Sequence, residues 1–136
     1  MANTTFNGPV RSENGFESIT KDATTGAVTT NATYGTSITG GVQSLSGAGA
    51  VDLTNLVTEL TTAAGAAAVT LADGTTSGQI KIINMIVDGG GTATVTPVTF
   101  ANGTTVAFDA VADSATLVWN STIGWVATSV NGATVA

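Results

Sequence analysis

The stretch IKIINMIVDGGGTATVTPVTF, residues 80–100, decides the fold class of this chain. Its first part is apolar on both faces of an extended strand: Ile80, Ile82 and Ile86 on one face, and Ile83, Met85 and Val87 on the other. Such a strand is covered on both sides, because a strand with one face in water alternates apolar and polar residues. The glycine triplet after Asp88 predicts a tight reversal that lets the next strand pack back against the first.

Further strand patterns follow along the chain. Residues 93–97 alternate small apolar residues with threonine, and Pro97 predicts that this strand lies at an edge or ends there. Similar patterns predict strands at residues 69–71, 106–110, 115–120 and 125–130. Gly, Asn and Asp turns separate them at the interval typical of all-β sandwiches and barrels. The sequence therefore predicts an all-β fold, a compact antiparallel β-sandwich or barrel-like domain.

The N-terminal part of the chain has a different composition. Residues 1–50 are rich in Gly, Ser, Thr and Asn with scattered single hydrophobic residues, too apolar for a linker and too sparse for a core. We interpret them as an extended N-terminal arm with short strands that precedes a β domain at residues 51–136. The alternative is that these residues are a flexible terminus without regular structure. Residues 51–57 fit either a strand or a short helix capped by Asp52, and we favour the strand.

Composition and charge exclude several classes of function. The 136 residues suit one domain, with 43% hydrophobic and only 9% charged residues, against about 25% charged in an average soluble domain. Three basic and nine acidic residues give a net charge of -6, so the basic patch required by nucleic-acid binding is absent. No apolar run approaches the roughly 20 residues of a membrane-spanning helix. We expect neither nucleic acid nor a membrane as partner.

The chain contains no cysteine and no histidine. Disulfides, Cys or His zinc sites and nucleophile–histidine pairs are therefore excluded. The glycine triplet lacks the Lys-Ser/Thr pair and the helix of a phosphate-binding loop. Asp109 and Asp113 could form the carboxylate pair of a glycoside hydrolase, but they flank a turn, where aspartates commonly bind the backbone. We expect no catalytic residue and no cofactor.

Other ionisable residues suggest weaker sites. Asp22, Asp73 and Asp88 offer oxygen ligands for Ca²⁺, but no loop has the acidic spacing of an EF-hand. We expect no dedicated metal site, and adventitious ion binding at an oligomer axis remains an alternative. Lys81 lies among isoleucines, so it either extends to an edge or pairs at an interface, for example with Glu59 or Asp88.

The doubly apolar strand at residues 80–87 requires a second layer. That layer is either intramolecular, from residues 51–71, or a neighbouring copy in a closed oligomer. Low charge and the core-poor arm favour the oligomer. Trp119 and Trp125 suit either a sugar-stacking site or the end of a core, and we favour the core. The residues expected at an oligomer interface or in the core are Ile80, Ile82, Ile86, Trp119 and Trp125.

Three stretches resemble small structural proteins of tailed-phage virions. They are MANTTFNGPVRSENGF (1–16), VTLADGTTSGQIKIINMIVDGGGTATVTP (69–97) and FANGTTVAFDAVADSATLVWNSTIGWVATSVNGATV (100–135). The likeness is to capsid decoration (cement) proteins and head-fibre proteins, in which a capsid-contacting N-terminal segment precedes a compact β domain. It covers most of the chain, above all the part after Val69, and includes no catalytic motif.

This resemblance implies a non-enzymatic virion protein on the outer surface of the phage head, synthesised in the host cytoplasm. Decoration proteins usually act as oligomers, often trimers, between major capsid protein subunits, and they oppose the pressure of packaged DNA. The expected partners are thus the major capsid protein and further copies of this chain, as a homotrimer. The expected capsid-binding residues are Phe6, Val10, Arg11 and Phe16. The aromatic rings would supply buried contact area, and Arg11 would pair with a carboxylate of the shell.

Two other classes of function stay open at this point. A phage fibre or adhesin module that binds a host surface glycan would need exposed aromatic side chains. A carboxylate-dependent glycan hydrolase would need a pair of acids free for catalysis, and the acid pairs of this chain lie in turns.

Overall fold

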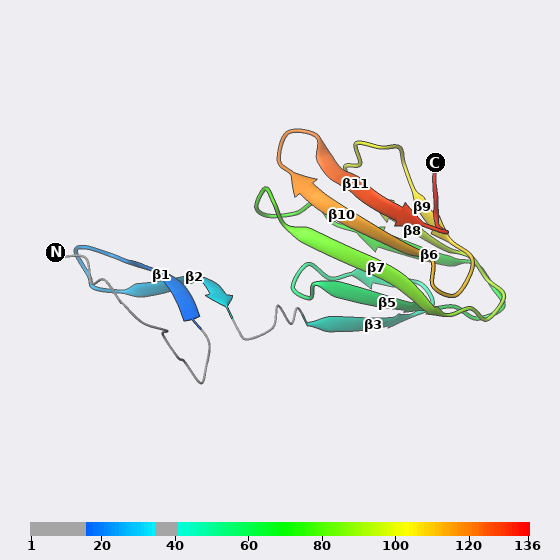
Figure 1. Ribbon diagram of the computed structural model, residues 1–136, viewed down its shortest axis with the longest axis horizontal. Helices are drawn as coiled ribbons and strands as arrows, with labels where there is room; N and C mark the ends of the chain where they lie inside the picture. Colours follow the sequence, from blue (N-terminus) through cyan, green and yellow to red (C-terminus); the bar gives the residue numbers. More distant parts are fainter. Residues whose placement is uncertain (1–15, 35–40) are drawn as a thin grey trace, which may run out of the picture. The chain divides into compact units, whose positions relative to one another are not determined.

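The computed structural model of the chain describes residues 16–34 and 41–136, including the side chains of residues 21–29 and 41–136. The chain divides into two compact units, Met1–Thr39 and Gly40–Ala136. Every regular element in the described residues is a β-strand (Figure 1), and none of these residues forms a helix long and apolar enough to cross a membrane.

The described part of the first unit is a β-hairpin. β1 (Phe16–Lys21) pairs antiparallel with β2 (Val28–Tyr34), in agreement with the short strands expected in the arm. Asp22 begins the turn between them. Its Oδ1 accepts hydrogen bonds from the backbone N–H groups of Thr24 at 2.8 Å and Thr25 at 2.7 Å. These bonds hold the pKa of Asp22 below its ordinary value, and they fix the local turn.

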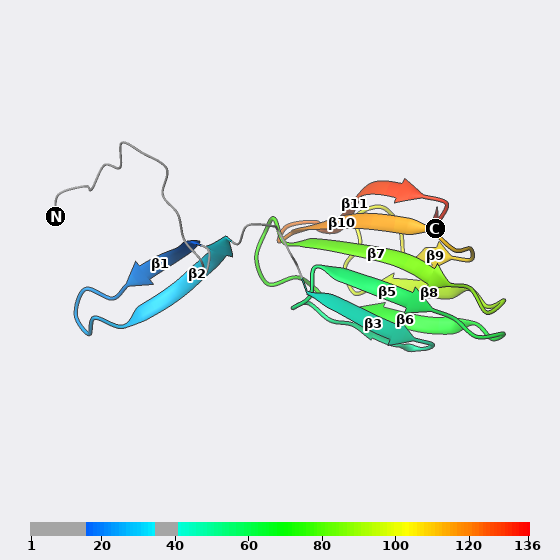
Figure 2. The same ribbon diagram turned by 60° about the horizontal axis from the view of Figure 1, so that its bottom comes forward.

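The second unit is a sandwich of two five-stranded sheets (Figure 1, Figure 2). Its strands are β3 (Val42–Ser46), β4 (Gly49–Val51), β5 (Val57–Thr61), β6 (Ala67–Leu71), β7 (Ile80–Val87), β8 (Ala93–Pro97), β9 (Val106–Phe108), β10 (Ser114–Asn120), β11 (Gly124–Asn131) and β12 (Thr134–Val135). The first sheet has the order β11-β10-β7-β5-β3, and the second sheet has the order β12-β9-β8-β6-β4. The predicted all-β sandwich is confirmed.

Strands β3 to β8 alternate between the two sheets along the chain. We call each pair of consecutive strands a coil: β3–β4 is the first coil, β5–β6 the second and β7–β8 the third. Successive coils stack in parallel, with β3, β5 and β7 as neighbours in the first sheet and β4, β6 and β8 in the second. Strands β9 to β12 complete the sheets in antiparallel pairs. Both sheets therefore contain parallel and antiparallel strand pairs. The prediction that the strands pair antiparallel is wrong for the coils.

The glycine triplet after β7 leads into the other sheet. The chain reverses as predicted, but β8 pairs with β6 and β9 in the facing sheet and forms no ladder with β7. A hairpin and a crossover between sheets use the same turn residues, because both reverse the chain over a few positions. The turn residues alone therefore do not distinguish the two connections.

The triplet lets two crossovers touch backbone to backbone. A Cβ atom at Gly89 or at Gly91 would overlap backbone atoms of residues 62–65, the crossover of the second coil. Gly90 has a φ of 92°, in the left-handed region that side chains disfavour. The third crossover can therefore stack on the second because Gly89 and Gly91 carry no side chain, while Gly90 allows the left-handed backbone between them.

The core lies between the sheets and is built from stacked inward rows. Parallel register places Leu60 beside Met85 and Val69 beside Val95. The buried apolar side chains are Val51, Leu60, Ala67, Val69, Leu71, Ile83, Met85, Ala93, Val95, Val106, Phe108, Ala115, Leu117, Trp119 and Trp125. Pro97 ends β8, as its missing N–H predicts.

The second sheet covers β7 on its inner face, where Ile83 and Met85 are buried. The cover of this face is therefore intramolecular. Ile80 and Ile82 point outward. The expectation that Val87 shares the inner face is wrong, because the register of β7 with β5 shifts after Met85 and leaves Val87 47% exposed. A bulge of this kind reverses the side-chain alternation beyond it.

The β domain begins earlier than the expected Val51. Residues 42–51 form the first coil, so they belong to the sandwich and not to the arm. Residues 52–56 are neither the expected strand nor the alternative helix. They form the connection between β4 and β5.

The contact between the crossovers predicts that Gly91→Ala destabilises the folded sandwich. We expect a loss of about 1–3 kcal/mol of unfolding free energy, because the new Cβ must displace backbone atoms that cannot rotate away. Gly65→Ala is the matched control, since a Cβ there meets nothing within 4 Å, and its effect should stay within about 0.5 kcal/mol. Chemical denaturation followed by tryptophan fluorescence measures both. Equal effects would contradict the stacking.

Candidate interaction surface

The outer side of the first sheet carries a continuous set of large aliphatic side chains. We call it the aliphatic face, and it consists of Val42, Val57, Ile80, Ile82, Val118 and Val126. Val42, Val57 and Ile82 are register neighbours across β3, β5 and β7. Ile80, Val118 and Val126 continue the set across β7, β10 and β11. Val42 is 54% exposed and Ile80 47%, whereas their neighbours shield the others in part.

The outer side of the second sheet has a different chemistry. Its outward residues are all alanine or threonine: Ala50, Ala68, Thr70, Thr94, Thr96, Ala107 and Thr134. Small and hydroxylated side chains are compatible with water, while contiguous exposed aliphatic area marks a contact surface. The sandwich therefore has one face suited to solvent and one suited to a partner.

A polar row borders the aliphatic face. Ser44, Glu59, Asn84 and Ser114 are register neighbours on the outer side of the first sheet. Glu59 is the one charged residue at the outward positions of these strands. Asn84 Oδ1 is buried and accepts no hydrogen bond from the described residues. The acid thus lies beside the aliphatic face and not within it.

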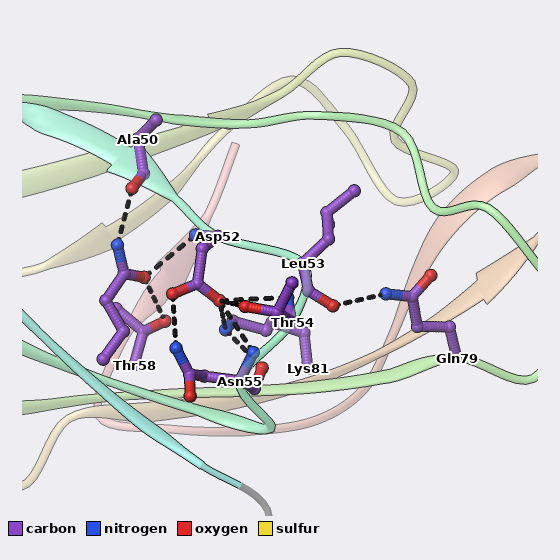
Figure 3. A network of polar contacts seen from close by, with 9 residues as sticks. Ala50, Asp52, Leu53, Thr54, Asn55, Thr58, Gln79 and Lys81 are labelled. Carbon is purple, nitrogen blue, oxygen red and sulfur yellow. Dashed lines mark hydrogen bonds and ion pairs between the residues drawn. The ribbon is translucent and has the colours of Figure 1, made fainter. Parts of the chain in front are cut away.

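A polar network fixes the end of the sandwich where β5 and β7 begin (Figure 3). Gln43 of the first coil connects three partners: its Nε2 donates to the carbonyl oxygen of Ala50 at 2.8 Å, and its Oε1 accepts from Asp52 N and Thr58 Oγ1, both at 2.9 Å. Gln79, just before the third coil, donates to the carbonyl oxygen of Leu53 at 2.9 Å. All three coils are thereby tied to the connection at residues 52–56.

Lys81 is the buried cation of this network. It points inward from β7 and is 1% exposed; its Nζ donates to the carbonyl oxygen of Asn55 at 2.7 Å and lies 3.6 Å from Asp52 Oδ1. Neither the predicted edge position nor the predicted pairing with Glu59 or Asp88 is correct. Alternation along β7 places Lys81 on the core face, and the connection at residues 52–56 supplies the acid.

Burial lowers the pKa of Lys81, and the Asp52 carboxylate opposes that effect. Burial alone would raise the pKa of Asp52. The hydrogen bonds from Asn55, together with the charge of Lys81 and the N–H of Thr54, outweigh it and hold the pKa of Asp52 below its ordinary value. Asp52 is therefore a turn cap and a counter-ion, a role that the sequence suggested only as a helix cap.

The candidate acid pair of a hydrolase is used inside a turn. Asp113 is buried, and its Oδ2 accepts the backbone N–H groups of Asp109 and Ala110, each at 2.9 Å. Asp109 itself is exposed. The turn interpretation of Asp113 is confirmed, and its carboxylate oxygen is already bound to the backbone.

The candidate calcium ligands lie in separate turns. Asp73 Oδ2 accepts from Thr99 Oγ1 at 3.1 Å, and Asp88 Oδ1 accepts from Gly90 N at 2.7 Å. Asp22 caps the hairpin turn of the first unit. Within the part of the chain that the structure describes, no group of three metal-binding side chains comes together.

Both tryptophans lie in the core. Trp119 and Trp125 pack edge to face with ring centroids 5.4 Å apart, and Trp125 Nε1 donates to the carbonyl oxygen of Ala72 at 2.9 Å. The core interpretation is confirmed, and these rings offer no stacking platform for a sugar. Ile80 and Ile82 lie on the aliphatic face, and Ile86 is exposed near the bulge.

The four expected capsid-binding residues fall largely outside the described residues. Phe6, Val10 and Arg11 lie outside them altogether, and Phe16 is described only as the first backbone position of β1, opposite Tyr34. Their role stays a prediction.

Comparison with known proteins adds no relative to this description. No protein-family model matches the chain, and no curated protein matches its sequence. Fold and surface together define a β-sandwich with three parallel coils, an internally satisfied polar network and one aliphatic outer face.

The Asp52–Lys81 pair predicts a pH-dependent stability. Asp52→Asn should cost about 1–3 kcal/mol at neutral pH, because Lys81 then keeps its buried charge without a counter-ion. Because the pKa of Asp52 is lowered on folding, its contribution is complete above about pH 4 and is lost as pH falls through the folded-state pKa. The difference between wild type and variant should therefore shrink in acid.

Denaturant unfolding at a series of pH values measures this difference. Asp109→Asn is the control, because it removes the same charge from an exposed side chain and should change stability by no more than about 0.5 kcal/mol. A cost of Asp52→Asn that stays constant down to pH 2 would contradict the counter-ion role.

Proposed function

We propose that this chain is a non-enzymatic virion structural protein. In this proposal it is a capsid decoration, or cement, protein that binds the outer surface of a phage head between major capsid protein subunits and stabilises the shell. Its partners are the major capsid protein and further copies of the chain, as a homotrimer.

The observation that carries the proposal is the aliphatic face on a sandwich whose buried acid and buried lysine are bound internally. Asp113 binds the backbone of its own turn, Asp52 and Lys81 bind each other, and the tryptophans fill the core. Among the outward positions of the two sheets, the Val and Ile side chains of the aliphatic face are the set suited to burial against another protein. That is the chemistry of protein–protein contact.

The two units of the chain have different roles in this proposal. In the proposal the arm anchors the chain to the shell through Phe6, Val10, Arg11 and Phe16, and the sandwich joins neighbouring anchors. Several arms held in one oligomer bind with a higher effective concentration than single arms. Such multivalent attachment would resist the separation of adjacent capsid subunits.

Binding to bare heads tests the proposal. Heads assembled from the major capsid protein of the same genome should sediment together with the full chain, and deletion of residues 1–20 should abolish this binding. Arg11→Glu should weaken it about 30-fold or more, as expected for a charged anchor residue.

Lys21→Glu is the matched control, because Lys21 is an exposed base just beyond the proposed anchor residues. It should leave head binding within about threefold of wild type, the range of an exposed ion pair. Failure of the full chain to sediment with the heads would contradict the proposed function. Retained binding after deletion of residues 1–20 would remove the arm from it.

A further inference from the structure

We infer that the aliphatic face is the surface through which copies of this chain associate, with the aliphatic faces of the copies meeting around the axis of the homotrimer. The inference deepens the proposed function, because it names the surface of the self-association, and it rests on that part of the proposal.

The two outer faces of the sandwich provide an internal comparison. They belong to sheets of equal strand number and share the parallel coils, yet one presents only Ala and Thr, while the other presents a set of Val and Ile side chains beside its polar positions. Strand propensity alone does not explain this difference, because threonine suits an exposed strand as well as valine does. The aliphatic residues are therefore placed where a second protein layer excludes water.

Charge identifies the occupant. The chain has a net charge of -6, and Lys81, the single base after Gly40, is buried. A basic partner would be attracted to the acids in the loops, such as Asp73 and Asp109, and not to an uncharged face. The aliphatic face fits a partner surface that is itself aliphatic and uncharged. The aliphatic face of a second copy is such a surface.

The polar row is compatible with this contact. Glu59 is the middle residue of β5 and lies in the polar row next to Val57, so two copies can join their aliphatic rows when their polar rows are displaced outside the contact, where each Glu59 stays in water. Like charges on an acidic protein then remain apart, and the contact itself is free of buried charge.

The size of the face predicts a reversible contact. Five strands at the usual spacing span about 19 Å, and strands of this length extend about 17–26 Å. The aliphatic face covers only part of this area, so each copy contributes less than about 400 Å² and a pair less than about 800 Å², below the roughly 1,000 Å² of a stable specific interface. The association should therefore depend on protein concentration.

Light scattering coupled to size exclusion, over a concentration series, tests the inference on the full chain. Wild type should rise from 13.3 kDa to a multiple of that mass. Val57→Lys should weaken this association at least tenfold, because it places like charges within the contact. Thr70→Lys is the matched control. It adds the same charge at an exposed outward position of β6, the second-sheet strand of the same coil, and it should leave the association unchanged.

The near-ultraviolet signal of the packed tryptophans reports whether each variant is folded. If Val57→Lys does not fold, Ile80→Lys replaces it, because Ile80 is 47% exposed at the start of β7. A wild type that stays at the monomer mass at every soluble concentration overturns the inference. A folded Val57→Lys or Ile80→Lys variant that associates like wild type also overturns it. So does a Thr70→Lys variant whose association is weakened as much as that of Val57→Lys.

Head binding by the same proteins separates this inference from the proposed function. A monomeric chain that binds heads would overturn the interface and leave decoration standing. A chain whose association is abolished by Val57→Lys, but which does not bind heads, would support the interface and contradict decoration.

Discussion

Backbone contact between successive crossovers is the constraint on which this sandwich depends. The third crossover lies so close to the second that Gly89 and Gly91 have no room for a Cβ. This contact sets the spacing of the coils at one end, and the ladder bonds of β5 with β7 and of β6 with β8 continue it along both sheets. The parallel register then places side chains of the same kind next to one another in the core, because each coil repeats the path of the one before.

At the opposite end the same spacing is maintained by polar contacts. Gln43, Asp52 and Lys81 come from different coils or their connections, and together they satisfy the backbone of the connection at residues 52–56. A buried lysine is costly unless it is paired and hydrogen-bonded. Here the cost is offset because the cation both binds a carbonyl and neutralises the turn-capping acid. The starts of β5 and β7, and with them the aliphatic face, are held in fixed register.

Much of the fold could be predicted from residue patterns. Alternation and turn residues located strands β6 to β11 to within a few residues, although not β12, and placed both tryptophans in the core, because these depend on local period and on apolar area. Strand direction could not be predicted in this way. Asp88 and its glycines fit a hairpin as well as a crossover, and the choice depends on residues 62–65, which are distant in sequence.

The candidate surface was only partly predictable for the same reason. The double apolar pattern of residues 80–87 identified a strand that needs two covers, and the structure supplies one of them, the second sheet. The partner of Lys81 was missed, because Asp52 reaches it through the stacking of coils and not through sequence proximity. Val42 was assigned to the arm, because a first coil with few hydrophobic residues is too sparse to be identified as part of a core until its parallel neighbour β5 is known.

The alternation of strands between sheets also governs how the chain can fold. Neighbouring strands in the coil part of either sheet are never consecutive in sequence, since a strand of the other sheet always lies between them. β3 cannot pair with β5, nor β5 with β7, until an intervening loop and strand have been closed off at an entropic cost. The antiparallel pairs β8–β9 and β10–β11 are the local exceptions in the sandwich. Formation of the two sheets is therefore coupled, and the high share of non-local pairings favours slow folding.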